Sequence, residues 1–252
     1  MSWQNLRPNL LNRSRLERGR GRGASRVTEL SYRSCHAIIN DTMYLPAHFE
    51  ESRPEVLQDV MREYPLGTLV TLGADGLTAN HVPFEYDPQP APFGTLRCHV
   101  ARGNSVWKDF DKQTPALVIF GGPQAYISPS WYEAKREHGK VVPTYNYVVV
   151  HTYGPMRIIE DAQWLHALVS RLTEKFESAR PQPWTVSDAP PDYIEKQLGA
   201  IVGIEIPVTR LIGKAKASQN RSAEDQAGVI RGLREDDPHD PMAEWMERDR
   251  ER

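Results

Sequence analysis

Residues 126–154 read YISPSWYEAKREHGKVVPTYNYVVVHTYG, with five tyrosines and one tryptophan around a short charged insert. Aromatic side chains bury large areas, but the tyrosine hydroxyl and the indole N–H need polar partners. The stretch therefore suits a half-exposed surface, either a ligand wall or a subunit interface. The alternative is an aromatic core whose polar tips bond to the backbone.

The two halves of this stretch predict different local structures. Its first half runs from a strand into a helix start, because Ser128 can cap a helix and Pro129 fits the first helical position. The free N–H groups of such a turn could also attract an anion. The second half, from Val141, leads into an apolar strand that we expect to continue through Ile159.

Four separated motifs resemble the PaiB family. They are MYLPAHFEE at 43–51, ISPSWY at 127–132, VVPTYNY at 141–147 and KASQNRS at 216–222. That family is described as FMN-binding negative transcriptional regulators with a split β-barrel fold, and the resemblance covers residues 43 to about 246. It implies an FMN cofactor held at the interface of a homodimer. Tyr145 departs from the PTWNY version of the motif, which keeps an aromatic platform but removes its indole donor.

The remaining pattern predicts a mixed α+β fold. Helices are expected at 53–64, from 161 to about 176, at 192–201 and at 223–233, and strands at 66–72, 77–86, 95–102, 115–122 and 202–213. Ala74-Asp75-Gly76 is a turn signal between two strands, which indicates a β-hairpin. Short connections favour an antiparallel sheet, and barrel closure is implied by the resemblance. We therefore expect an antiparallel split β-barrel with peripheral helices and a C-terminal helical part.

The candidate cofactor-binding residues come from the motifs and from one strand. In split-barrel flavoproteins the corner after residues 95–102 contacts the cofactor, so by resemblance Arg102 would pair with the FMN phosphate. Lys216 and Gln219 lie in a polar block that could hold a phosphate or form a solvated loop. His81 could face either a ligand or water. The full set is His81, Arg102, Asn104, Trp107, Tyr126, Ser128, Ser130, Trp131, Tyr145, Asn146, Tyr147, Lys216 and Gln219.

Charge divides the chain into parts. Residues 1–42 hold eight arginines and three acidic residues, a net charge of +5, so the whole-chain charge of −2 leaves −7 for residues 43–252. The Arg/Gly-rich residues 1–42 are predicted to be a disordered extension, either a nucleic-acid-binding arm or an artefact of an upstream start site. Residues 43–246 are predicted to form the FMN-binding domain and 247–252 a charged tail. DNA binding, possible by resemblance, is not supported by a domain of charge −7.

Composition excludes several classes of protein. No apolar run reaches the 18 to 20 or so residues of a membrane helix, and a cytoplasmic location is expected. Cys35 and Cys98 lack metal-ligand spacing and the histidines are scattered, so we expect no metal site. No GxGxxG, P-loop, GxSxG or HExxH motif occurs.

Two functions remain open from the sequence. The resemblance implies a flavin-binding negative regulator of transcription, which is not expected to be an enzyme. An FMN-dependent oxidoreductase is the alternative, because the flavin itself carries redox chemistry. No nucleophile beside a base is evident, and no catalytic residue is predicted.

Overall fold

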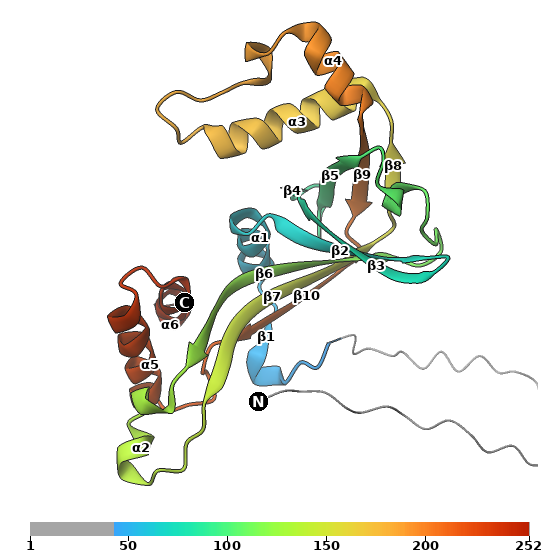
Figure 1. The fold of residues 1–252 in the computed structure, drawn as a ribbon. Coiled ribbons are helices and arrows are strands. Elements are labelled where there is room, and N and C mark those ends of the chain that lie inside the picture. Colours follow the sequence, from blue (N-terminus) through green and yellow to red (C-terminus); the bar gives the residue numbers. More distant parts are fainter. Residues whose placement is uncertain (1–42, 252) are drawn as a thin grey trace, which may run out of the picture. The chain divides into compact units, whose positions relative to one another are not determined.

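Two antiparallel sheets organise the part of the chain that the structure describes, residues 43–251 of a computed structural model (Figure 1). Residues 1–42, with the predicted disordered extension, lie outside the described residues. Sheet A has six strands in the order β1-β10-β7-β6-β2-β3 and sheet B has four in the order β4-β5-β9-β8. Every strand pairing is antiparallel, which confirms the predicted α+β split barrel.

The strands agree closely with the alternation of the sequence. Those of sheet A are β1 (Glu50–Glu51), β2 (Leu66–Gly73), β3 (Gly76–Pro83), β6 (Ala116–Ile127), β7 (Thr144–Gly154) and β10 (Arg210–Lys216). Those of sheet B are β4 (Glu85–Asp87), β5 (Thr95–Ala101), β8 (Arg157–Ile159) and β9 (Ile201–Pro207). The predicted hairpin is β2–β3, and Gly76 at its turn has φ +110°, which favours glycine. The strand expected to run through Ile159 instead ends at Gly154, and β8 then joins the other sheet.

The chain passes between the sheets at tight corners. Gly154 ends β7 where a Cβ would lie 2.1 Å from the carbonyl oxygen of Pro207, so only glycine fits this approach of β7 to β9. Thr209 N donates to Tyr153 O at 2.8 Å, and Val208 N donates to Gly94 O at 2.9 Å. These bonds fasten the ends of the two sheets around one core.

One hydrophobic core fills the space between the sheets. Leu69, Phe84 and Phe120 come from sheet A and the segment after it, and Leu96 and Ile204 come from sheet B. Helix α1 (Pro54–Glu63) adds Val56, Leu57, Val60 and Met61 to this core, as its helical periodicity predicts. A Cβ on Gly213 of β10 would lie 2.2 Å from Leu57, so the helix packs directly on the core side of sheet A.

The other helices lie outside the barrel. They are α2 (Ala134–Glu137), α3 (Ala162–Glu177), α4 (Pro191–Gly199), α5 (Ala223–Asp236) and α6 (Pro241–Glu251), with 3₁₀ turns η1 (Ala47–Phe49), η2 (Ser105–Trp107), η3 (Pro129–Trp131) and η4 (Val186–Asp188). Asp161 caps α3 by accepting from Trp164 N at 2.7 Å. Helix α6 includes residues 247–251, which the sequence analysis set apart as a charged tail.

Two further serines cap a turn and a helix near the C-terminal part. Ser128 accepts from Ser130 N at 3.2 Å, but the turn that it caps is the single 3₁₀ turn η3. Ser222 caps α5 by accepting from Asp225 N at 3.2 Å. The Asp225 carboxylate accepts from Ala134 N at 3.0 Å, so it joins α5 to α2 instead of completing a capping box.

Candidate functional site

Strand β7 divides its side chains between two faces. Asn146, Val148, Val150 and Thr152 are buried toward the core. The alternate residues Tyr145, Tyr147, Val149, His151 and Tyr153 lie on the opposite face, which we call the outer face of sheet A. Strand register extends this face across the sheet. His151 of β7 lies opposite Ile212 of β10 on one side and opposite Ile119 of β6 on the other. Beyond β6, Thr68 of β2 lies opposite Ile119, and His81 of β3 lies opposite Thr68.

Three cations of β10 lie on this outer face, and we call them the cation row. Arg210 is opposite Tyr153, Lys214 is opposite Val149, and Lys216 is opposite Tyr147. The Arg210 guanidinium carbon lies 3.8 Å from the Tyr153 ring centroid, and Lys214 Nζ lies 5.3 Å from that of Tyr147. Within residues 43–251 none of the three cations forms an ion pair. Glu50 of β1 lies opposite Lys214, but it forms no ion pair with the row in the described part of the chain, so the row carries an excess of positive charge.

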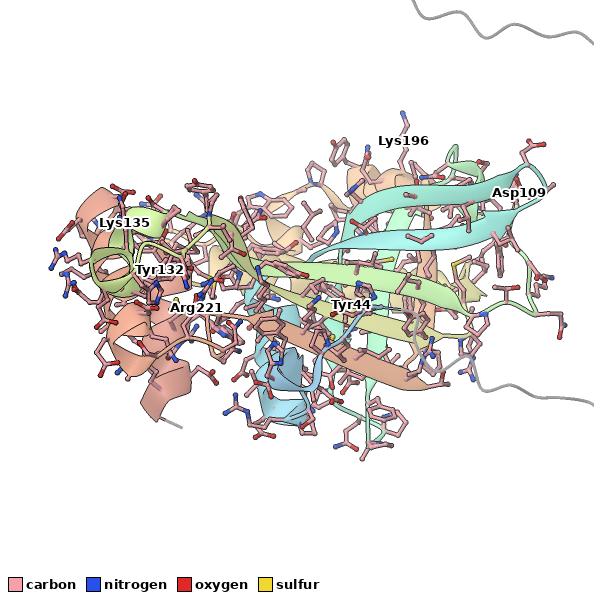
Figure 2. The ribbon with its side chains drawn as sticks, turned by 90° about the horizontal axis from the view of Figure 1, so that it is seen from below. Tyr44, Asp109, Tyr132, Lys135, Lys196 and Arg221 are labelled. Carbon is pink, nitrogen blue, oxygen red and sulfur yellow. The ribbon has the colours of Figure 1, made fainter. Side chains whose placement is uncertain are left out.

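The two lysines are positioned by neutral acceptors. Lys214 is buried, and its Nζ donates to the carbonyl oxygen of Tyr44 at 2.9 Å (Figure 2 labels Tyr44 beside the strands of sheet A). Lys216 Nζ donates to Tyr145 O at 2.7 Å and to Thr144 Oγ1. Burial lowers the pKa of Lys216. An ammonium has three donors, so each lysine keeps donor capacity for an anion.

His151 lies at the centre of the outer face. Its Nδ1 atom is buried and has no hydrogen-bond partner among the described residues. Burial lowers the pKa of His151, so the imidazole is neutral at pH 7. A buried polar atom of this kind is costly unless a ligand or water completes it.

A β-bulge in β6 opens the same face. The register of β6 against β7 shifts between Gly121 and Gln124, and a Cβ on Gly121 would meet no atom within 4 Å. Small-molecule sites have volumes of about 300 to 1,000 Å³. The hollow here measures about 490 Å³ and is lined by Glu63, Tyr64, Pro65, Leu66, Pro83, Gly121 and Phe176. Bulges recur beside functional sites because they interrupt the sheet and re-aim side chains.

Five of the predicted site residues belong to the outer face. They are His81, Tyr126, Tyr145, Tyr147 and Lys216. Tyr126 and Tyr145 lie opposite each other on β6 and β7 and are 56% and 48% exposed. His81 is exposed on the outer face, so whether it contacts a ligand or only water stays a prediction. This part of the face offers flat aromatic surface beside the lysines.

The predicted corner residues are engaged within the chain. Arg102 donates to Gly199 O at 3.0 Å and to Ile201 O at 3.3 Å, and it pairs with Glu160 at 2.5 Å. Asn104 accepts from Val106 N and donates to Asn80 Oδ1 at 2.8 Å, and Trp107 Nε1 donates to Arg102 O. This corner follows β5 of sheet B, and the arginine fork predicted for a phosphate already holds α4 and β9.

The other predicted residues build the connection to the C-terminal helices. Gln219 bonds to Ala217 N and Ala215 O within its own loop, and Ser130 Oγ accepts from Lys135 Nζ. Asn146 is buried and donates to Ser218 Oγ at 2.9 Å. Trp131 packs on α5, where a Cβ on Gly232 would lie 2.4 Å from the indole. Figure 2 shows Tyr132, Lys135 and Arg221 together at this end of the domain.

The sequence analysis missed Arg210, Lys214 and His151. The alternation of β7 was available as a signal, because it places His151 on the side of Tyr147. The positions of Arg210 and Lys214 depend on the pairing of β10 with β7, which joins residues about 60 apart in the chain. A lone sequence does not give that register.

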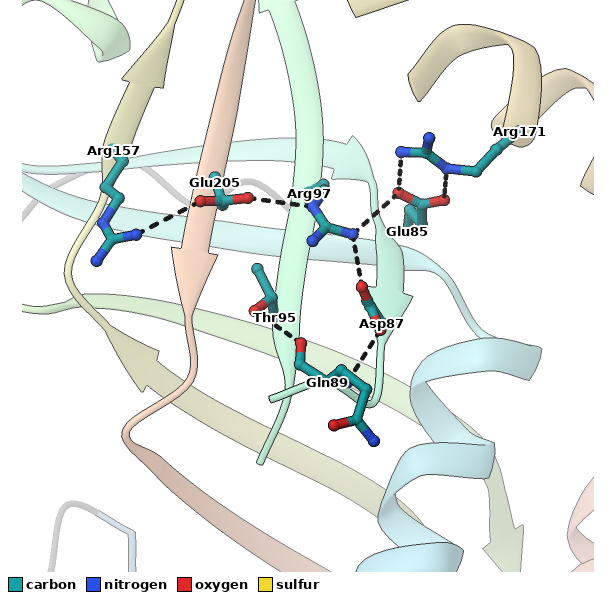
Figure 3. Close-up of polar contacts among 8 residues, drawn as sticks. All are labelled: Glu85, Asp87, Gln89, Thr95, Arg97, Arg157, Arg171 and Glu205. Atoms are coloured by element: carbon teal, nitrogen blue, oxygen red, sulfur yellow. Dashed lines mark hydrogen bonds and ion pairs between the residues drawn. The ribbon is translucent and has the colours of Figure 1, made fainter. Parts of the chain in front are cut away.

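Sheet B carries a contrasting set of charges on its own outer side (Figure 3). Arg97 pairs with Asp87 at 2.9 Å, with Glu205 at 3.2 Å and with Glu85 at 3.8 Å. Arg157 lies 3.6 Å from Glu205, and Arg171 of α3 contacts Glu85 at 2.5 Å. We call these six residues the sheet B network, and its three arginines balance its three carboxylates.

Residues 43–251 contain neither a membrane-spanning helix nor a cluster of metal-ligating side chains. No helix there is long and apolar enough to cross a membrane. The same residues contain no cluster of three or more histidine, cysteine or acidic side chains suited to a metal ion.

Comparisons with known proteins identify the family to which this chain is similar. A family model described as "Putative FMN-binding domain" matches residues 43–210. "Protease synthase and sporulation protein PAI 2" of Bacillus subtilis is 36% identical over 207 residues, which cover 81% of this chain and 97% of that protein. An uncharacterized protein of Aspergillus fumigatus is 34% identical, covering 76% and 90%. The solved structure of the flavocytochrome Anf3 from Azotobacter vinelandii has a TM-score of 0.50 at 11% identity, covering 71% and 75%, so it is similar in fold alone.

Proposed function

Since this chain belongs to the PaiB family of FMN-binding proteins, we propose that the outer face of sheet A binds the FMN cofactor between two subunits and that the flavin-loaded dimer acts as a negative regulator. The cation row is the observation that carries this proposal. FMN combines a planar ring with a phosphate, and the face combines aromatic surface with three cations for which no ion pair is found among residues 43–251. The residues therefore fit the cofactor by chemical type.

Each group on the face has a role in this proposal. Arg210 has the planar donor fork that suits a phosphate, and its stacking on Tyr153 limits its freedom before binding. The tyrosines of β6 and β7 provide the flat surface for the flavin ring, and neutral His151 can exchange a hydrogen bond with a ring heteroatom. The bound flavin would supply the redox chemistry, and the protein would orient it and exclude water.

A dimer follows from the openness of this face. Leu66 is 62% and Leu77 is 77% exposed, and both belong to the β2–β3 hairpin beside the face. An exposed apolar sheet surface beside tyrosines is typical of a subunit interface. A second copy would cover the flavin from the other side, because one sheet cannot enclose it.

An FMN-dependent oxidoreductase is the second candidate function, and charge favours it. Residues 43–252 carry a net charge of −7, which gives the domain no general attraction to DNA. Salt-dependent retention of promoter DNA by the flavin-loaded protein would support direct regulation. Oxidation of a reduced nicotinamide without such retention would support the enzyme.

Sedimentation with and without FMN tests the shared site. We expect the wild-type protein to be a dimer with quenched flavin emission, and Tyr147→Ala to weaken both dimer and FMN binding by about tenfold. Trp131→Ala is the matched aromatic control, because its ring packs on α5 of the same chain. It should lower stability by about 3 kcal/mol and leave FMN affinity unchanged. A wild-type monomer that binds FMN tightly would contradict the shared site.

A further inference from the structure

Helix α4 leaves its apolar side chains incompletely packed. None of its nine residues is buried, although Ile194 and Leu198 face the same side and Tyr193 is 54% exposed. A cavity of about 300 Å³ lies beneath this helix. Its lining comes from α3, α4, the η4 segment and both central strands of sheet B: His99, Val169, Thr173, Trp184, Val186, Tyr193, Ile194, Gln197, Leu198 and Ile201.

The chemistry of this lining is selective. No Asp, Glu, Lys or Arg is among these described residues, so the cavity offers no counter-charge to an ionised ligand. Trp184 and Tyr193 provide aromatic walls, and the aliphatic side chains provide the rest of the apolar surface. The volume is at the lower end of the range for small-molecule sites, about 300 to 1,000 Å³.

His99 is the polar group whose bonding is incomplete. Its Nδ1 atom is buried and lacks a hydrogen-bond partner among the described residues. Burial lowers the pKa of His99, so the ring is neutral at pH 7 and can accept or donate one hydrogen bond without carrying charge. A ligand with one hydroxyl or N–H group would complete it.

This cavity is separate from the proposed flavin site. Its lining residues share no member with the outer face of sheet A, and the cation row lies on β10 of that sheet. A flavin phosphate in the α4 cavity would have no cation beside it, so FMN does not suit this lining. The cavity thus fits a second, different ligand.

We propose that the cavity beneath α4 binds a small uncharged aromatic molecule, whose ring packs between Trp184 and Tyr193 and whose single hydroxyl or N–H group bonds to His99. A neighbouring hollow of about 550 Å³ shares Thr173, Trp184 and Val186 with this cavity. It contains Glu174 and Glu177, so a longer ligand would place a polar substituent there. The site gives the protein a means to sense an aromatic metabolite independently of its flavin.

Phenol and toluene test the proposal, because they differ by the one hydroxyl group that His99 would bind. Calorimetric titration of the full chain should give saturable binding of both probes. His99→Phe should lower the affinity for phenol by about fivefold to tenfold and the affinity for toluene by less than about twofold. His239→Phe is the matched control, since His239 is exposed in the turn before α6, and it should change neither affinity.

A second variant tests the site independently, in case His99→Phe does not fold. Tyr193 is half exposed, so Tyr193→Ala should leave the hydrophobic core intact. It should lower the affinity for both phenol and toluene by about fivefold. Absence of saturable binding to the wild-type protein would overturn the proposal. Equal losses of phenol and toluene in His99→Phe would overturn the assigned role of His99. A change of sedimentation mass in Tyr193→Arg, with no phenol binding to wild type, would assign the cavity to a subunit contact instead.

Discussion

The outer faces of the two sheets use the same charged groups in opposite ways. On sheet B each arginine of the network has a carboxylate partner, and Arg97 has three. On sheet A the cation row has aromatic rings and neutral oxygen atoms as neighbours, without an ion pair in the described part of the chain. A compensated set of charges stabilises a fold, whereas an uncompensated set attracts an anion. The difference supports the proposal that the outer face of sheet A binds the phosphate of FMN, whereas the sheet B network stabilises the fold.

Replacement of one arginine on each face is the sharpest test of this comparison. Arg210→Met should weaken FMN binding by about tenfold to 100-fold, because it removes a charge-assisted fork from the phosphate. Arg157→Met makes the same substitution on sheet B, where Arg157 is 61% exposed, and should leave FMN affinity unchanged. Flavin fluorescence titration measures both. Equal affinities of the two variants would remove the distinction between the faces.

Loss of Arg97 should affect stability rather than ligand binding. Arg97→Met leaves Glu85, Asp87 and Glu205 close together without their central cation, and we expect the free energy of unfolding to fall by about 1 to 3 kcal/mol. Urea denaturation with and without FMN gives both quantities. Arg97→Lys keeps the positive charge, so its free energy of unfolding should fall by less than that of Arg97→Met. A variant of normal stability with weakened FMN binding would reverse the assignment.

Acid should weaken the sheet B network through Asp87. The N–H of Gln89, at 2.9 Å, and the neighbouring Arg97 hold the pKa of the Asp87 carboxyl below its usual value of about 3.9. A depressed folded-state pKa stabilises the protein above the unfolded pKa, and this stabilisation is lost as pH falls through the folded value. The stability difference between wild type and Asp87→Asn should therefore shrink below about pH 4. A constant difference from pH 6 to pH 2.5 would contradict this role.

The sequence predicted local structure better than it predicted the site. Hydrophobic periodicity located α1 and α3, and Asp75-Gly76 located the β2–β3 turn, because these signals lie within a few neighbouring residues. The site depends on which strands pair. The sequence context of Arg102 predicted a phosphate ligand. In the structure its guanidinium donates to carbonyl oxygens of α4 and β9, which lie about 100 residues later in the chain. Arg210 and Lys214 gained their significance only when β10 paired with β7.

Trp131 shows the same limit of prediction from sequence within the aromatic stretch 126–154. Its position in an aromatic stretch suggested an interface, but the fit depends on Gly228 and Gly232, about 100 residues later in α5. Gly232 leaves space for the indole, and Gly228 leaves space for the backbone carbonyl of Trp131. Tyrosines from the same stretch, Tyr145 and Tyr147, face outward instead. Aromatic residues of one stretch therefore differ in role, because Trp131 lies in the η3 turn against α5 whereas Tyr145 and Tyr147 lie on the outer face of β7.

The pairing of β10 also constrains the order in which the protein can fold during synthesis. Strand β10 lies between β1 and β7, and Glu50 pairs with Lys214, so sheet A cannot close until residue 216 has left the ribosome. Until then the tyrosine-bearing edge of β7 has no strand partner, and an unpaired edge invites contact with other chains. Such long-range pairing slows folding, because the chain loses conformational entropy in bringing distant segments together before their contacts stabilise them. The strand that carries the cation row is thus also the last one needed to protect the nascent sheet.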